Sequence, residues 1–290
     1  MGTKTLGSDD LKTGLAIHAK RIDTGSAWVV TNHPLGAFYD PPADSGIFPN
    51  KRYRLVDLVL ASAAAPTYFN EVMIDVEFDE RRKPMQRGYF VDGAVSANNN
   101  PSLQLFMLAL EPSYKFGWKS GAEHFMMTSC GTGCRLPAVE GRAFVGLPPG
   151  MRGVHALRGM VFDTQMQGVM MMQAFSEPRK PWRVNGEIGD MRGTCLSGEP
   201  LLDFQRLDIA LDTKPKPKRK SDPTPPMTAL ERVIGRELDA ETLHGLDLMD
   251  NGKRANMELL LEVGTAVGKT FVDAQYPDPK FDLAEWRSTA

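Results

Sequence analysis

The sequence predicts an α/β protein with layers of helices on a mainly parallel sheet. Short apolar runs typical of buried strands alternate along the chain with segments of helical periodicity, the pattern of layered α/β folds. With 290 residues and 42% hydrophobic content, the chain has enough apolar material for one large domain or two smaller ones.

The net charge, the apolar stretches and the N-terminal segment indicate which partners and which compartment to expect. A net charge of −2 gives no overall attraction to nucleic acid, so we expect no nucleic-acid partner. We also expect no transmembrane segment, because no stretch approaches the roughly 18 apolar residues of a spanning helix. The N-terminus lacks a basic segment leading into an apolar one, which predicts a cytoplasmic protein.

The three cysteines are Cys130, Cys134 and Cys195, an odd number with no paired framework, so we expect reduced thiols. Cys130 and Cys134 could form half of a metal site, but no second Cys or His pair follows at ligand spacing. The five histidines form no ligand motif either, and each is expected to be structural or exposed. No metal and no cofactor are therefore predicted.

The first third of the chain predicts strands and one helix. Strands are expected at 15–21 and 27–32, separated by a turn at 23–26. Residues 53–65 have apolar side chains at helical spacing, and Pro66 ends the expected helix. In residues 72–78 apolar and polar residues alternate, as in a half-buried strand.

The middle of the chain contains the stretch of most interest, Tyr89–Pro101. An apolar strand at 88–91 ends at Asp92-Gly93, and Asn100 and Pro101 then form the cap and first residue expected of a helix. A second buried strand is expected at 124–133, and a Met-rich helix at 154–175.

The last third predicts a strand, a loop and helices. Residues 201–211 form a further expected strand. The proline-rich basic stretch 214–226 is expected to be a solvated loop and not a nucleic-acid or membrane patch. Helices are expected near 228–236, 239–249 and 254–272.

Two glycine-containing stretches imitate nucleotide-binding motifs. Residues 263–270 have three residues between their glycines where a phosphate loop needs four, and they lie inside the predicted last helix. The Gly131-Thr132-Gly133 turn lacks the third glycine of a dinucleotide fingerprint, and chain geometry alone explains it.

Four stretches taken together resemble the patatin-like phospholipase family. They are LASAAAPTYF at 60–69, FVDGA at 90–94, NNPS at 99–102 and SCGTG at 129–133, and they occur in the family's order and spacing. The resemblance continues through IGD at 188–190, LSGEPLL at 196–202 and MDN at 249–251, so it spans nearly the whole chain.

The resemblance implies a three-layer α/β/α patatin-like (lysophospholipase-like) fold and hydrolysis of lipid acyl esters by a serine and aspartate dyad. Asp92, in the Asp92-Gly93-Ala94 motif, matches the dyad's aspartate, which acts as general base. A carboxylate at a strand end can do this work if burial raises its proton affinity. The implied partner is a lipid or acyl-ester substrate, with peripheral membrane contact. Without the surrounding match, an Asp-Gly after a strand would indicate only a turn.

The serine of this dyad is missing from the sequence. The family places it in a GxSxG turn between a strand and a helix, preceded by a Gly-rich oxyanion segment. No serine here has glycine two positions before it, and no two glycines are adjacent. Residues 6–14 already resemble a segment downstream of that turn. We therefore expect residues 1–290 to be the C-terminal portion of one patatin-like domain, N-terminally incomplete.

Within that domain we expect sheet and helices at 1–213, the basic loop at 214–226 and a helical segment at 227–290. Three interpretations stay open. The chain is an incomplete acyl hydrolase that is inactive alone, a non-catalytic lipid- or partner-binding relative, or one half of a split enzyme whose N-terminal chain is separate. We favour the first as the statement of family function.

Overall fold

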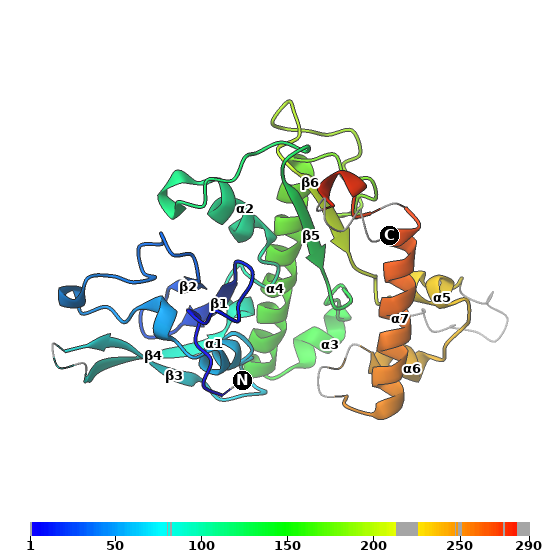
Figure 1. Ribbon diagram of the computed structural model, residues 1–290. Helices are drawn as coiled ribbons and strands as arrows, with labels where there is room; N and C mark the ends of the chain where they lie inside the picture. The colour runs from blue at the N-terminus through cyan, green and yellow to red at the C-terminus, as the bar shows by residue number, and fades with distance from the viewer. Residues whose placement is uncertain are drawn as a thin grey trace.

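The structure is a computed structural model that describes residues 2–79, 81, 83–212, 226–246, 248, 251–274 and 276–282. It contains helices and strands in two separate sheets, and the predicted α/β class is confirmed. The larger sheet has four strands in the order β2-β1-β4-β3 (Figure 1). These strands are β1 (Ala16–Arg21), β2 (Ala27–Thr31), β3 (Val72–Phe78) and β4 (Pro84–Asp92).

The expectation of a mainly parallel sheet is wrong for the described residues. Every pairing in the four-stranded sheet is antiparallel, and only the pair β5 (Met126–Cys130) with β6 (Asp203–Leu207) is parallel. For two of these pairings the cause is the length of the connection, because β1 and β2 are joined by a short turn and β3 and β4 by a short hairpin connection. Parallel strands need a crossover of a dozen or more residues, which these connections cannot provide.

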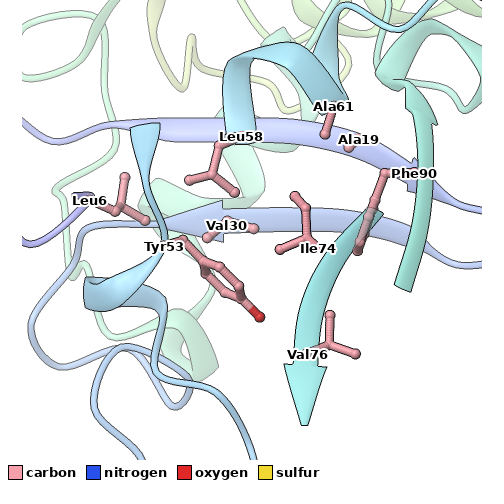
Figure 2. Packing of buried hydrophobic residues seen from close by; sticks show 9 residues of the cluster. All are labelled: Leu6, Ala19, Val30, Tyr53, Leu58, Ala61, Ile74, Val76 and Phe90. Atoms are coloured by element: carbon pink, nitrogen blue, oxygen red, sulfur yellow. The ribbon is translucent and has the colours of Figure 1, made fainter. Parts of the chain in front are cut away.

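The four-stranded sheet has its own hydrophobic core. Phe90 of β4 is fully buried and lies against Trp28 of β2, with ring centroids 4.4 Å apart. Helix α1 (Leu55–Ser62) covers this face of the sheet through Leu58 and Ala61. Figure 2 shows the buried cluster, which comprises Leu6, Ala19, Val30, Tyr53, Leu58, Ala61, Ile74, Val76 and Phe90.

Helices cover both faces of the β5–β6 pair. Met127 packs in a cluster with Phe106 of α2 (Ser102–Leu110) and Met172 of α4 (Pro149–Ala174). Met126, one residue earlier, faces the opposite side and packs against a cluster that includes Val263 of α7 (Arg254–Val272). Successive side chains on a strand point to opposite faces, so the pair lies between two helical layers. Figure 1 shows α4 beside β5 and α7 beyond β6.

The remaining elements are short. They are the helices α3 (Gly141–Gly146), α5 (Ala229–Ile234) and α6 (Ala240–Gly245), and the 3₁₀ turns Ala43–Ser45, Asn50–Arg52, Gly93–Val95 (η3), Pro112–Tyr114 and Pro279–Phe281. No helix within the described residues has the length and apolar character that crossing a bilayer requires.

Most predicted elements exist close to their expected bounds. Helix α4 begins five residues before the predicted 154, because Pro149 suits the first turn of a helix. Residues 214–225 of the predicted basic loop lie outside the described residues, as do Met249 and Asp250 of the resemblance. The cysteines are free thiols, as expected.

Candidate functional site

Asp92 is the last residue of β4 and begins the turn η3. Its backbone N–H donates to the carbonyl of Ala64 at 3.0 Å, which ties the end of β4 to the segment that follows α1. Its Oδ1 accepts a hydrogen bond from the Ala94 N–H at 2.8 Å, and the side chain is half-buried. The predicted placement of a carboxylate at the end of a strand is confirmed, and the turn holds one oxygen of that carboxylate in place.

Gly93 is required by a close backbone approach. A Cβ at this position would lie 2.8 Å from the carbonyl oxygen of His18 on β1, closer than real Cβ contacts allow. The φ angle of Gly93 is not in the left-handed region, where nine other glycines lie. The role of Gly93 in the structure is to let β1 and η3 lie close together.

Asp92 and Ala94 help to line a cavity of about 410 Å³ between β1, α1 and η3. Apolar residues form much of the remaining wall, including Ile17 and Val59. Ser62, at the end of α1, also lines the cavity, but no hydrogen bond joins it to Asp92 among the described residues. The arrangement offers a carboxylate beside an apolar space of the size that small ligands occupy.

His18 is the site residue that the sequence did not indicate. It lines the same cavity, is buried with 8% of its surface exposed, and has no hydrogen-bond partner for Nδ1 within the described part of the chain. Burial lowers the pKa of its imidazole, which keeps the ring neutral in the folded protein. The pairing of β1 with β4 brings it here, and no sequence motif marks that long-range register.

We expect the free energy of unfolding to decrease as the pH falls below about 6.5, the ordinary pKa of histidine. The unfolded chain binds a proton at His18 below that pH, whereas the folded protein, with its lowered pKa, resists binding it. Urea unfolding at pH 7.5, 6.5 and 5.5 measures this loss. His18→Gln should flatten the pH dependence, and His244→Gln, at an exposed position, should leave it unchanged. Equal pH dependence in His18→Gln and the unmodified protein would refute this assignment.

A second, more polar cavity of about 270 Å³ lies on the other side of the segment Asn99–Ser102. Asn100, only 3% exposed, lines it, and its Oδ1 accepts from the hydroxyls of Ser102 at 2.6 Å and Ser129 at 3.1 Å. Its Nδ2 has no partner among the described residues. The Oδ1 also accepts from the Ser102 N–H at 3.2 Å. The predicted cap at Asn100 and first helical position at Pro101 are each one residue early, because α2 begins at Ser102 with Pro101 at its cap position.

A buried ion pair between Arg206 and Asp208 lies at this second cavity, which Arg206 helps to line. The Arg206 guanidinium donates to Asp208 Oδ2 at 2.5 Å and to Ser129 Oγ at 2.7 Å, and the two charged side chains are 5% and 1% exposed. A Cβ on Gly131 would lie 2.1 Å from the Asp208 carboxylate, and Gly133 adopts a φ of 98°. Close packing at Gly131 and the positive φ at Gly133 account for the two glycines of the Gly131-Thr132-Gly133 turn.

β5 has one unpaired edge beside this second cavity. Within the described residues it pairs only with β6, and Thr128 and Cys130 are exposed. Asn99 and Pro101 line both cavities. This short segment therefore lies between Asp92 and the unpaired edge of β5.

In the described part of the chain, the other sequence motifs do not line either of these two cavities. The 263–270 stretch lies within α7, as predicted, so it is not a phosphate loop. Asp190 lies on a surface turn, where its Oδ1 accepts from the Arg192 N–H at 3.1 Å. No cluster of potential metal ligands occurs among the described residues.

Comparison with known proteins adds no relative. No protein-family model matches this sequence, and a search of curated proteins finds no match.

Proposed function

We propose that this chain carries the aspartate part of a patatin-like lipid acyl hydrolase with a Ser/Asp dyad. The observation that supports the proposal is the position of Asp92, at a strand end, half-buried and facing an apolar-lined cavity. The three-layer patatin-like architecture belongs to this proposal too. The helices on both faces of the β5–β6 pair support it, while the antiparallel larger sheet does not.

The chemistry assigned to Asp92 is general base catalysis. Its Oδ1 is engaged by the Ala94 N–H, which leaves Oδ2 to accept the proton of a serine hydroxyl. The serine oxygen would then bond to the ester carbonyl carbon, and Asp92 would return the proton to the departing alcohol. Water, activated by the same carboxylate, would release the acid from the acyl-serine. The apolar wall of the cavity is suited to the acyl chain.

The serine and the oxyanion donors are supplied, in this proposal, by polypeptide outside this sequence. The unpaired edge of β5 is a suitable place for an added strand, because exposed edges present unpaired N–H and C=O groups to a partner chain. Helices pack on both faces of the β5–β6 pair through Met126 and Met127, as they do on a parallel sheet, although Thr128 and Cys130 of β5 are exposed. A strand added there would end near Asn99 and Pro101, next to Asp92.

The second candidate is a non-catalytic lipid- or partner-binding relative. The cavity beside Asp92 favours it, since an apolar-lined space of about 410 Å³ can hold an acyl chain without any nucleophile. A sharp monomer peak with a cooperative thermal transition would favour this alternative over the incomplete hydrolase.

We expect the 290-residue chain alone to show no turnover of a short-chain nitrophenyl ester above buffer. No serine in it has the context of a GxSxG turn, and Ser62 has no hydrogen bond to Asp92. Turnover should appear when the chain is co-expressed with a segment from a patatin-like enzyme that carries the Gly-rich turn and the strand-GxSxG-helix unit. Turnover by the chain alone, or none after complementation, contradicts the proposed function.

A further inference from the structure

The surface formed by α3 and the first part of α4 has a charge that differs from the rest of the protein. Residues 141–162 contain three arginines and no aspartate or glutamate, a formal charge of +3, whereas the whole chain has a net charge of −2. We refer to this stretch as the α3–α4 basic surface. Figure 1 shows α3 beside the start of α4, and the rings of Phe144 and His155 lie 5.6 Å apart.

Large apolar side chains are exposed on the same surface. Between Pro149 and Met160 every residue of α4 is exposed except His155 and Gly159, which are partly buried. A helix with so little burial gains little from tertiary packing, and its glycines lower its intrinsic stability. The exposed apolar residues are Val145 at 68%, Met151 at 53%, Val154 at 37%, Leu157 at 37% and Met160 at 64%.

The arginines of this surface have no carboxylate partner among the residues that the structure describes. Arg152 donates to the backbone carbonyls of Leu147 at 2.8 Å and Val145 at 2.6 Å. Among the described residues, neither Arg152 nor Arg142 or Arg158 forms an ion pair with a carboxylate. Within the described part of the chain, three positive charges therefore lie near exposed apolar groups without an ion-pair partner.

We propose that the α3–α4 basic surface binds an anionic lipid surface, with the apolar side chains entering the interface and the arginines contacting lipid headgroups. Exposed apolar residues next to unneutralised arginines on a helix are the combination that interfacial helices use. A nucleic-acid backbone would satisfy the arginines but leave the apolar groups in water. This inference rests on the proposed function. A lipid acyl hydrolase must reach its substrate in a lipid surface, and the α3–α4 basic surface would bring the protein there.

The position of α4 connects this surface to the candidate site. Helix α4 contacts η3, which follows Asp92 directly. Gln165 of α4 accepts a hydrogen bond from Asn99 Nδ2 at 2.6 Å, and Asn99 lines the cavity of Asp92. One helix therefore runs from the proposed lipid contact to the wall of that cavity.

Sedimentation with vesicles tests the proposal without any turnover. The full chain is mixed with vesicles of ether-linked phosphatidylcholine, alone or with phosphatidylserine, so that no ester can be cleaved. We expect binding only to the vesicles with phosphatidylserine. Each arginine near an anionic surface contributes about fivefold to binding, so Arg142→Gln, Arg152→Gln and Arg158→Gln together should lower the partition coefficient roughly a hundredfold.

The matched control removes the same charge elsewhere. Arg87→Gln, Arg236→Gln and Arg254→Gln replace three exposed arginines that pair with carboxylates, and this variant should bind vesicles like the unmodified protein. Leu157→Asn with Met160→Gln should weaken binding and leave the oligomeric state unchanged. The proposal fails if both triple variants bind equally, if binding ignores phosphatidylserine, or if the apolar variant converts a dimer to a monomer. Vesicle binding without hydrolysis after complementation would reject the proposed function alone.

Discussion

Asp92→Asn is expected to lower the rate of ester hydrolysis by the complemented protein by about 10²–10⁴-fold, the usual contribution of a general base. The amide keeps the size of the side chain and its Oδ1 can still accept from the Ala94 N–H, so the turn should persist. What the variant loses is the ability of Oδ2 to take the serine proton. The measurement is kcat/KM on a nitrophenyl ester.

Asp190→Asn is the matched control for this variant. Asp190 lies in another stretch of the resemblance, and its side chain accepts from a backbone N–H in the same way, but it is on a surface turn away from the cavity. It should leave most of the activity intact. If the complemented protein is active and Asp92→Asn does not slow it, the resemblance has been assigned to the wrong carboxylate.

The second large effect concerns stability. Asp208→Asn should lower the free energy of unfolding by about 3–5 kcal/mol, because it leaves the Arg206 charge buried without its partner. The carboxylate also accepts from the Gly133 N–H at 3.0 Å and the Ile209 N–H at 2.9 Å, so its removal disturbs the turn beside the second cavity. Urea unfolding measures the change.

Asp75→Asn provides the comparison for a surface pair. Asp75 accepts from Arg87 at 2.9 Å, but the arginine is 60% exposed, so this loss should stay within about 1 kcal/mol. A loss for Asp208→Asn no larger than that for Asp75→Asn would contradict the stabilising role assigned to the buried pair.

Local pattern was sufficient to predict most elements of this fold. Residues 72–78 form β3 as predicted, and α7 covers the predicted 254–272, because alternation and helical spacing report directly on which face of an element is buried. Strand direction was not predicted correctly. It depends on which strands pair, and the pairing of β1 with β4 joins residues about seventy positions apart that no local pattern connects.

The candidate site also has residues that local sequence signals predict and residues that only long-range contacts place. Asp92 could be located from sequence because its strand, turn and following helix cap are local signals. His18 could not, because the pairing of β1 with β4 places it. The burial of the Arg206–Asp208 pair could not either, because it depends on contacts with Ser129 and Gly133 in a distant segment. The polar residues of β6 would suggest an exposed strand, yet Gln205 and Arg206 are buried. Gln205 Oε1 accepts from the Lys180 N–H and Arg206 donates to Ser129 Oγ, whereas Gln205 Nε2 has no partner among the described residues.

In the proposed function, the catalytic serine lies on polypeptide outside this sequence and works with Asp92. The most direct test is to treat the complemented protein with a fluorophosphonate probe and locate the adduct by mass spectrometry of digested peptides. We predict one adduct, on the serine of the complementing GxSxG segment, and none on the 290-residue chain. A stoichiometric adduct on Ser62, the serine that lines the Asp92 cavity, or on any other serine of this chain would contradict the claim.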